Sequence, residues 1–514
     1  MQSKFSNKEL GLITTPYKTA DYIISKLGII HQNQLILDPC VGPGIFVKIL
    51  LQKGVKKEQI HAFDINGEYK ESLKALGIHF EQKDSLLSIN RFDYNHYDFI
   101  VGNPPYLNKS SSYVKENRKK LRKIYGKINS HETYSMFIVN SIWRLKEGGK
   151  LAFITSDSFL TLKTHQRLRE FILRNCLINE ILLAPQELFS SQNVSTSPTI
   201  IVFTKCSEGN KHHKKRLDNM MRVISRVENE DQYKNPTEIS ELPQRSYNAL
   251  PFNIFYTDVE PQIINFFEEA PKLVKYVRGY IGMHTHNNKK YIAAIEGTEL
   301  AKIFQKKNLM NGDSKDQYHI ISSDNLKKDK WRPYLKRGGA EQYYRPIMEA
   351  LNWTEEAIKV YDIPNSVPFE REGIIISGIS SRLAVRYMPK GCYWDSNKAI
   401  GCILEDDTLS IEYLLGLLNS SLYNYLAKGI INNTNSIQLS GIHALPIIMP
   451  NSKTKNLIEN YVKKIIKELI QNNKYNYVQE QKMIDNLIFD LHEKNYRFPK
   501  PLKDKLDNEY SIYK

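Results

Sequence analysis

The chain has 514 residues, of which 41% are apolar and 11% aromatic, so it is long enough for two or three folded domains with substantial cores. Lys and Arg number 72 against 56 Asp and Glu, a net charge of +16 that favours a polyanionic partner such as nucleic acid, although a lysine-rich proteome would give the same surplus. No apolar run reaches membrane-spanning length and the N-terminus lacks the apolar core of a signal sequence, so we expect a soluble cytoplasmic protein without membrane contact. The five cysteines have no CxxC spacing, so we expect neither a disulfide framework nor a zinc site.

Residues 1–205 show short apolar runs that alternate with helix-like segments, a pattern that predicts a parallel α/β sheet with helices on both faces. In such sheets ligands bind beyond the carboxyl ends of the strands, so the polar residues that follow each strand are candidates for a site. A helix is expected at 136–145. The expected strands are 34–37, 60–65, 97–101, 150–155 and 199–203.

The composition changes at 206–232, where a polar and charged stretch predicts a linker or an exposed hairpin. Residues 245–450 carry many short strand-like runs and turns, which indicate a mixed α+β region. Apolar residues at helical spacing in 458–469 and 484–491 predict a packed pair of terminal helices. We therefore expect three parts, at 1–240, 241–450 and 451–514.

The first expected strand ends in an acidic residue, Asp38, and a tight turn with Gly42 and Gly44 follows. Glycines allow a backbone to approach a ligand closely. A dinucleotide-binding turn would need a third glycine where the chain has Val47, and a Walker loop would need Gly-Lys-Ser/Thr. The turn therefore suits a nucleoside ligand without a pyrophosphate, although many turns of this kind bind nothing.

Two further acidic residues follow the next strands. Asp64 ends the second expected strand, where a carboxylate can accept hydrogen bonds from both hydroxyls of a ribose. Asp84 stands where a third strand would end, and its carboxylate could accept a hydrogen bond from an adenine amino group. Each residue taken alone is equally consistent with an ordinary aspartate at a strand end.

The sharpest signal is Asn103-Pro104-Pro105-Tyr106, directly after a third apolar run. Prolines fix the backbone and remove N–H donors, so the Pro104 carbonyl and the Asn103 side-chain oxygen can both accept hydrogen bonds from one exocyclic amino group. Tyr106 offers an aromatic face for stacking on a planar base. A rigid proline turn without function is disfavoured, because the acidic motifs precede this one in order.

Together these motifs resemble those of class I S-adenosylmethionine-dependent methyltransferases. The segment 38–46 resembles their cofactor loop, and the segment 103–106 resembles the catalytic tetrad of the enzymes that methylate amino groups. Thr15-Pro16-Tyr17 is similar to the N-terminal cofactor motif of gamma-type, TaqI-like DNA adenine-N6 methyltransferases. The resemblance covers 11–205 well and the C-terminal half more loosely. It implies a Rossmann-like α/β catalytic domain, a mixed α+β target-recognition domain and terminal helices.

The resemblance implies methyl transfer from S-adenosylmethionine to the N6 amino group of adenine in double-stranded DNA by base flipping, in a restriction-modification or phage-defence system. It assigns the cofactor and the target base to two sets of residues. Thr15, Asp38, Cys40, Gly42 and Gly44 would line the methionine end and the loop, Asp64 would hold the ribose, and Asp84 and Pro105 would hold the cofactor adenine. Asn103 and Pro104 would hold the target amino group, Tyr106 and Phe189 would stack on the target base, and Phe137 would line the pocket.

The chain departs from the family pattern at Cys40-Val41, where smaller residues are common, and at Ser85, where an apolar residue often covers the adenine. The tetrad also occurs in methyltransferases of ribosomal RNA adenine and of release-factor glutamine, although those chains usually lack a large C-terminal domain. RNA adenine, protein glutamine and a catalytically idle DNA-recognition subunit are therefore the alternatives. A cognate restriction endonuclease or defence subunit is a possible partner.

Two basic segments are candidates for DNA contact. Between Leu107 and Lys127 there are eight basic residues and one acidic residue, which indicates a clamp on the DNA backbone, a solvated loop that is disordered in the free protein, or both. The segment 331–353 interleaves basic and aromatic residues, which suits phosphate contact and base stacking, or else reflects ordinary core aromatics. The candidate residues are Lys109, Arg118, Lys119, Arg122, Lys123, Arg332, Arg337 and Arg345.

The remaining motifs give weaker evidence about function. His212-His213 and His284-Thr285-His286 lack carboxylate or cysteine partners at metal-binding spacing, so we expect no metal site. The periodicity of 411–421 predicts a helix that packs in a core. No nuclease motif precedes the catalytic part, so a fused restriction enzyme is not expected.

Overall fold

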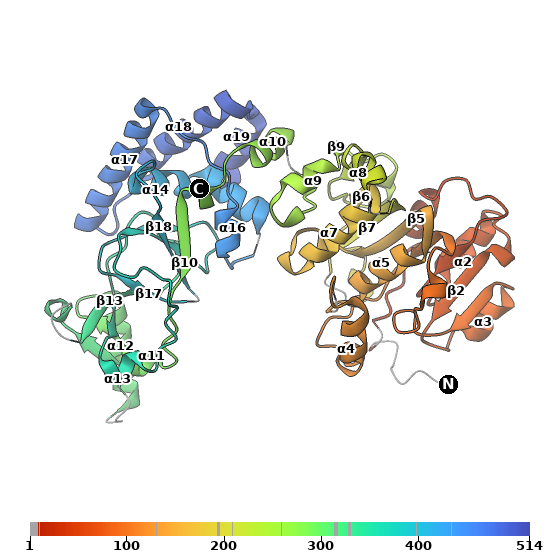
Figure 1. Ribbon diagram of the computed structural model, residues 1–514, viewed down its shortest axis with the longest axis horizontal. Coiled ribbons are helices and arrows are strands. Elements are labelled where there is room, and N and C mark those ends of the chain that lie inside the picture. Colours follow the sequence, from red (N-terminus) through yellow and green to blue (C-terminus); the bar gives the residue numbers. More distant parts are fainter. Residues whose placement is uncertain are drawn as a thin grey trace. The chain divides into compact units, whose positions relative to one another are not determined.

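The computed structural model divides the chain into two compact units, Met1–Val259 and Glu260–Lys514 (Figure 1). Each unit has its own sheets and its own core, so each is described by itself. The residues that the structure describes are 9, 11–129, 131–192, 196–207, 209–258, 260–312, 317–326, 330–396, 398–432 and 434–513.

The first unit is built on a sheet with the strand order β3-β2-β1-β4-β5-β7-β6-β8-β9. Strands β1 to β5 run parallel, whereas β7 is antiparallel to both of its neighbours and β9 is antiparallel to β8. The strands are β1 (Ile36–Asp38), β2 (Ile60–Asp64), β3 (His79–Gln82), β4 (Tyr97–Gly102), β5 (Leu145–Ser156), β6 (Cys176–Leu183), β7 (Pro198–Lys205), β8 (Met220–Ile224) and β9 (Ile239–Pro243). The helices are α1 (Tyr17–Ser25), α2 (Ile45–Gln52), α3 (Lys70–Ala75), α4 (Ser112–Tyr125), α5 (Thr133–Arg144), α6 (Ser158–Thr161), α7 (Gln166–Asn175), α8 (Asn210–Leu217) and α9 (Arg245–Ala249).

The central strands are buried on both faces, which is why they read as continuous apolar runs in the sequence. Ile36 of β1 and Val101 of β4 pack in a core with α1 and α2. On the other face, α5 packs against β5, α4 and α7. The strand order reverses between β1 and β4, and ligands of doubly wound sheets bind at such a switch point.

The predicted α/β sheet with helices on both faces is confirmed, and the expected strands correspond to β1, β2, β4, β5 and β7. The sheet is not wholly parallel, because β7 enters it in the opposite direction. The prediction of a linker or exposed hairpin at 206–232 is wrong, since this stretch forms α8 and β8. The charged composition of this stretch suggested exposure to solvent, but not all of its charged side chains are exposed. Arg216 is 4% exposed and donates a hydrogen bond to the Cys206 carbonyl at 3.1 Å.

The second unit holds a sheet with the order β10-β18-β15-β16 and a second sheet with the order β12-β11-β14-β13-β17, so it has the predicted mixed α+β character. The strands are β10 (Val277–Ile281), β11 (Ile292–Ile295), β12 (His319–Ile321), β13 (Trp331–Leu335), β14 (Glu349–Asn352), β15 (Gly373–Ser377), β16 (Val385–Met388), β17 (Tyr393–Trp394) and β18 (Ala399–Leu404). The helices are α10 (Pro261–Glu269), α11 (Asn288–Tyr291), α12 (Glu299–Asn311), α13 (Glu355–Ile358), α14 (Ile411–Asn419), α15 (Ser421–Asn424), α16 (Leu439–His443), α17 (Ser452–Gln471), α18 (Val478–Tyr496) and α19 (Lys500–Lys505).

The terminal helices α17 and α18 pack against each other and against α14, as Figure 1 shows. Their buried residues include Ile458, Val462, Ile484 and Ile488, which fall on the predicted apolar stripes. The predicted core role of α14 is confirmed, because every residue from 413 to 419 is buried. The domain boundaries expected after residues 240 and 450 stay predictions. In the structure the range of the first compact unit ends at Val259 and includes β9 and α9, and α17 packs within the second unit. Among the described residues, no helix combines the length and the apolar character that crossing a membrane requires.

Candidate active site

A cavity lies at the switch point of the sheet, beyond the carboxyl ends of β1, β2 and β4. The structure brings most of the predicted cofactor residues to its wall, although they come from five separate stretches of chain. Gly44, Pro104, Tyr106 and Phe189 are not among its lining residues. The predicted residues that line the cavity are Thr15, Asp38, Cys40, Gly42, Asp64, Asp84, Asn103, Pro105 and Phe137.

The glycine turn takes the backbone conformation that glycine favours. Gly42 has φ 49° and Gly44, which precedes α2, has φ 83°. Asp64 fixes this turn, because its Oδ2 accepts a hydrogen bond from the Gly42 N–H at 2.8 Å and its Oδ1 accepts one from the Asn66 N–H at 2.8 Å. Burial raises the pKa of Asp64, and these two hydrogen bonds oppose that rise. Asp64 therefore shapes the cavity wall as well as lining it.

Asp38 is a buried carboxyl with one oxygen unused. The residue is 2% exposed, and its Oδ1 accepts a hydrogen bond from the Cys40 N–H at 3.1 Å. Among the described residues, Oδ2 has no hydrogen-bond partner. Burial raises the pKa of Asp38 to about 8, and the nearby charge of Asp64 adds to the rise. A cationic donor in the cavity would satisfy Oδ2 and favour the ionised form.

Asn103 has the same kind of open acceptor. Its Nδ2 donates to the Ile13 carbonyl and to Thr15 Oγ1, both at 3.1 Å. Because a carbonyl can only accept, the contact with Ile13 determines which end of the amide is the NH₂ group. The opposite end, Oδ1, is buried and has no partner among the described residues. Asn103 therefore presents a fixed, unfilled acceptor next to the cavity.

The loop of the tetrad is held by Thr133 at the start of α5, a residue that the sequence analysis missed. The Thr133 hydroxyl donates to the Pro105 carbonyl and accepts from the Leu107 N–H at 3.0 Å. The Thr133 N–H donates to the Leu107 carbonyl at 2.9 Å. These bonds fix the backbone on the far side of the two prolines. A lone threonine near a helix start gives no local signal of this role.

Asp84 lines the cavity, and three donors hold its carboxylate. Its Oδ1 accepts from the Leu86 and Leu87 N–H groups at 3.0 Å each, and the Tyr113 hydroxyl lies 2.9 Å from Oδ2 and 3.1 Å from Oδ1. Burial raises the pKa of Asp84, and these hydrogen bonds oppose the rise. Tyr113 is the second residue that the sequence analysis missed. Its signal was an aromatic side chain inside an otherwise polar and basic run.

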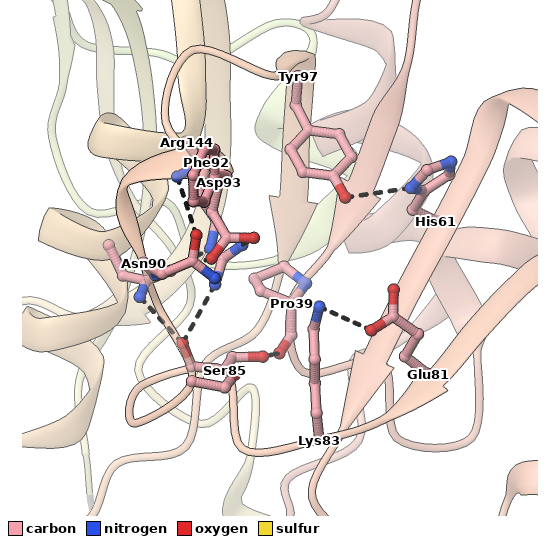
Figure 2. Close-up of polar contacts among 12 residues, drawn as sticks. Pro39, His61, Glu81, Lys83, Ser85, Asn90, Phe92, Asp93, Tyr97 and Arg144 are labelled. Carbon is pink, nitrogen blue, oxygen red and sulfur yellow. Dashed lines mark hydrogen bonds and ion pairs between the residues drawn. The ribbon is translucent and has the colours of Figure 1, made fainter.

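The departure from the family pattern at Ser85 has a structural reason. The Ser85 hydroxyl donates to the Pro39 carbonyl at 2.6 Å, which ties the loop after β3 to the loop after β1 (Figure 2). The Ser85 carbonyl accepts from Asn140 Nδ2 at 3.0 Å, and Arg144, only 1% exposed, lies beside it. Lys83 pairs with Glu81 at 2.8 Å in the same view. Ser85 therefore makes a hydrogen bond within the wall of the cavity, where an apolar residue would contact a ligand instead.

The two aromatic residues expected to stack on a base lie next to each other. The centroids of the Tyr106 and Phe189 rings are 6.4 Å apart and the ring planes are inclined at 64°. The two rings therefore make an edge contact and do not face each other in parallel across a space for a base. Phe189 is 1% exposed, and the Tyr106 hydroxyl is buried without a partner among the described residues. Neither ring lines the cavity, so stacking of a base on Phe189 or between the two rings would require these side chains to move.

The basic stretch after the tetrad is ordered. Residues 112–125 form α4, so the alternative of a disordered loop is wrong. Tyr113, Val114, Leu121 and Tyr125 are buried at helical spacing and anchor the helix. The predicted DNA-binding residues Arg118, Lys119, Arg122 and Lys123 are all exposed on its outer surface, and Lys109 is exposed ahead of it.

The basic and aromatic stretch of the second unit is mostly core. Trp331, Tyr334 and Tyr343 are at most 5% exposed, so the prediction that these aromatics stack on bases is wrong. The Arg345 side chain is 9% exposed and donates to the Gly338 and Arg337 carbonyls, at 3.0 and 2.9 Å. Its predicted role in reading DNA does not fit this burial.

The other two arginines of this stretch differ from Arg345. Arg332 is half-buried on β13 and donates to the Trp331 carbonyl at 3.1 Å. Arg337 remains 45% exposed, although its Nε donates to buried Glu349 at 3.0 Å. Arg337 is therefore the best placed of the three for an external contact.

Comparison with known proteins assigns these two regions. Residues 25–189 match the Eco57I restriction-modification methylase family, and residues 314–447 match the TaqI-like C-terminal specificity domain. The first region is thus similar to a methylase domain and the second to a specificity domain of restriction-modification type. The region 25–189 contains the tetrad and most of the residues that line the cavity. The predicted resemblance to restriction-modification methylases with a TaqI-like specificity domain is confirmed.

Parts of the chain are also similar to curated proteins. Type II methyltransferase M.HincII of Haemophilus influenzae is 30% identical over 38% of this chain and 37% of the relative. Adenine-specific methyltransferase BrxX of Escherichia coli O9:H4 (strain HS) is 24% identical over 72% of this chain and 29% of the relative. The chain therefore spans only 37% and 29% of the length of these two relatives. A solved structure of the type IIL restriction-modification enzyme MmeI in complex with DNA shares the fold, with 13% identity over 94% of this chain and 73% of that one and a TM-score of 0.53.

Proposed function

We propose that this protein is a DNA adenine-N6 methyltransferase that uses S-adenosylmethionine, flips its target base out of the duplex and serves a restriction-modification or phage-defence system. Asn103 carries the proposal. Its NH₂ group is held by Ile13 and Thr15, and its buried oxygen is left as an acceptor without a donor. An exocyclic amino group supplies the missing donor, and leaving such an oxygen unpaired costs about 1–3 kcal/mol.

The residues of the cavity fit S-adenosylmethionine, which supplies an electrophilic methyl group on a sulfonium sulfur when it is bound. Asp38 Oδ2 would accept from the ammonium group of the methionine part, which stabilises the ionised carboxylate against its burial. Asp64 retains lone pairs for the ribose hydroxyls, since an ionised carboxylate has about four acceptor sites. Asp84 would accept from the adenine amino group.

At the target, Asn103 Oδ1 and the Pro104 carbonyl would accept the two N–H bonds of the adenine amino group. These two hydrogen bonds would orient the amino nitrogen so that its lone pair faces the cavity. Pro104 and Pro105 have no N–H of their own, so the loop offers the amino group only acceptors. The amino group loses its proton after it has gained the methyl group and a positive charge, so no conventional general base is needed.

Flipping the base costs a few kcal/mol of unstacking and unpairing. Stacking on an aromatic face is worth about 1–3 kcal/mol per base, and Tyr106 or Phe189 would supply that face. The exposed basic surface of α4, directly after the tetrad, would hold the phosphates of the duplex near the flipped base. The match of the second unit to a TaqI-like specificity domain supports double-stranded DNA as the substrate.

The test is methyl transfer by the purified full chain to duplex DNA, structured RNA and a glutamine peptide, with labelled S-adenosylmethionine. We expect N6-methyladenine in duplex DNA alone, detected by mass spectrometry of the digested nucleosides. Methylation-sensitive long-read sequencing of DNA from expressing cells would then give one methylated motif. Methylation of RNA or peptide instead, or DNA binding without turnover, would replace the proposal with one of those functions.

A further inference from the structure

Three side chains that commonly bind metal ions gather on the surface of the second unit. The ligand atoms of His284, His286 and Asp362 all lie within 4.8 Å of one another. His286 Nε2 is 2.9 Å from Asp362 Oδ2, and the two histidine rings are 4.6 Å apart. The sequence alone predicts no metal site here, because Asp362 is far from the histidines along the chain.

The backbone brings the three residues together. His284 and Asp362 face each other in an antiparallel bridge, in which each N–H donates to the carbonyl of the other at 3.1 and 3.0 Å. The residues next to them, Met283 and Tyr361, belong to one buried cluster. The two chain segments are therefore held in register by hydrogen bonds and by core packing, independently of any ion.

A tight turn sets the direction of the second histidine. The Asn287 N–H donates to the Thr285 carbonyl at 2.6 Å, and His286 between them has φ 56°, a conformation that is uncommon for a residue with a side chain. Thr285 is 1% exposed and its hydroxyl donates to Asn288 Oδ1 at 2.7 Å. Burial of Thr285 leaves the two histidines on the solvent side.

We propose that His284, His286 and Asp362 bind a divalent transition-metal ion, with Zn²⁺ as the best fit. Two imidazole nitrogens and one carboxylate oxygen are a donor set that Zn²⁺ accepts, and three protein ligands leave a coordination position open to water. The His286 and Asp362 side chains are 49% and 74% exposed, so the ion can enter without any opening of the fold. Bound metal would pin the 284–286 turn to the segment around Asp362.

A second cluster, Glu147, Cys206 and His212 in the first unit, is a weaker competitor. Cys206 is 2% exposed, and the Glu147 carboxylate already accepts hydrogen bonds from the Ser207 N–H at 3.0 and 3.2 Å. A metal ion there would have to reach a buried thiol and displace the Ser207 contacts of Glu147, whereas at the first cluster it would displace only the contact between the exposed His286 and Asp362 side chains. The experiment must nevertheless distinguish the two clusters.

The test is calorimetric titration of the tag-free, chelator-stripped full chain with ZnCl₂. We expect a single tight site, with an affinity that falls about tenfold or more, equivalent to about 1.4 kcal/mol, in His286→Ala and in Asp362→Asn. His319→Ala, which removes another exposed histidine of the same unit, and His212→Ala should leave the affinity unchanged. All of these side chains are at least partly exposed, and circular dichroism would verify that each variant folds.

Co²⁺ gives an independent readout, because its visible absorption depends on the number and type of its ligands. The spectrum of the Co²⁺-loaded chain should change in His284→Ala and not in His212→Ala. Absence of Zn²⁺ binding, binding that only His212→Ala removes, or binding that survives both His286→Ala and Asp362→Asn would each overturn the proposal. None of these outcomes bears on methyl transfer.

Discussion

The Tyr113 hydroxyl lies 2.9 Å from Asp84 Oδ2, and this hydrogen bond joins the basic helix α4 to the wall of the cavity. Tyr113 is 4% exposed, so it moves only if α4 moves with it. If DNA binds the outer surface of α4 and S-adenosylmethionine contacts Asp84, the hydrogen bond between Tyr113 and Asp84 links the two binding sites. Binding of either ligand should then affect the affinity for the other by the same factor.

The first prediction concerns Tyr113→Phe, which removes the hydroxyl and keeps the ring. In the wild type, duplex DNA should tighten S-adenosylmethionine binding severalfold, within the roughly 5–150-fold range of typical coupling between sites. In Tyr113→Phe the two affinities should become closer to independent. Calorimetric titration of the cofactor with and without duplex measures both values.

Tyr125→Phe is the matched control for this coupling. It removes a buried hydroxyl from the same helix, one that donates to the Leu86 carbonyl at 2.8 Å and makes no bond to Asp84. Its loss should lower stability, by about 0.5–1.5 kcal/mol, and leave the coupling in place. Equal coupling in Tyr113→Phe and the wild type would mean that the hydrogen bond only supports the fold.

The second prediction separates target binding from cofactor binding. Asn103→Ala should abolish methyl transfer, because it removes the acceptor for the target amino group. Cofactor affinity should change by less than about tenfold, or 1.4 kcal/mol. Thr15→Val is the comparison, since it removes one partner of Asn103 Nδ2 and leaves Oδ1 intact. A much larger loss of cofactor affinity in Asn103→Ala would show that Asn103 acts on the cofactor.

The third prediction follows from the pKa of Asp38, which burial raises to about 8 from an ordinary value of 3.8. Between pH of about 4 and 8, the folded protein holds a proton that the unfolded chain has released. The stability of the free protein therefore falls as the pH rises through this window. Asp38→Asn, which cannot ionise, should raise the melting temperature more at pH 8 than at pH 5.

Asp490→Asn, at an exposed position of α18, is the control and should leave the pH dependence of unfolding unchanged. The same Asp38→Asn variant should bind S-adenosylmethionine more weakly, because a neutral amide cannot pair with an ammonium group. Stabilisation combined with weaker binding is the expected signature of a carboxyl kept for a ligand. A gain in melting temperature that is equal at both pH values would refute the buried, protonated state.

The cavity could be predicted because its residues lie at strand ends. Asp38 and Asp64 are the last residues of β1 and β2, and Asn103 directly follows β4. Parallel strands bring their carboxyl ends to one edge of the sheet. What could not be predicted depends on burial and on contacts between distant segments. Arg345 reads like a DNA contact in the sequence, and only the folded chain shows its guanidinium bound to the Arg337 carbonyl.

Two further features of the structure could not be predicted from the sequence for the same reason. The segment 107–127, which contains α4, was ambiguous because its eight basic residues outnumber its apolar ones, yet Leu121 and Tyr125 belong to a buried stripe at helical spacing. The pairing of Asp362 with His284 joins residues that no local pattern connects. Local spacing therefore predicted the chemistry of the cavity, and tertiary packing decided which charged side chains were left at the surface.

The last prediction tests α4 as a phosphate-binding surface. Arg118, Lys119, Arg122 and Lys123 are exposed, so replacing all four with Gln should leave the fold intact. Binding should weaken by a similar factor on cognate and scrambled duplexes, because phosphate contacts position a protein without reading sequence. The slope of log affinity against log salt should become shallower by about 0.9 for each phosphate that the variant no longer neutralises. Replacing four exposed lysines of the second unit, Lys453, Lys467, Lys474 and Lys494, removes the same charge and should change the slope much less. If both variants shift the slope equally, only the net charge matters and α4 has no special role in holding DNA.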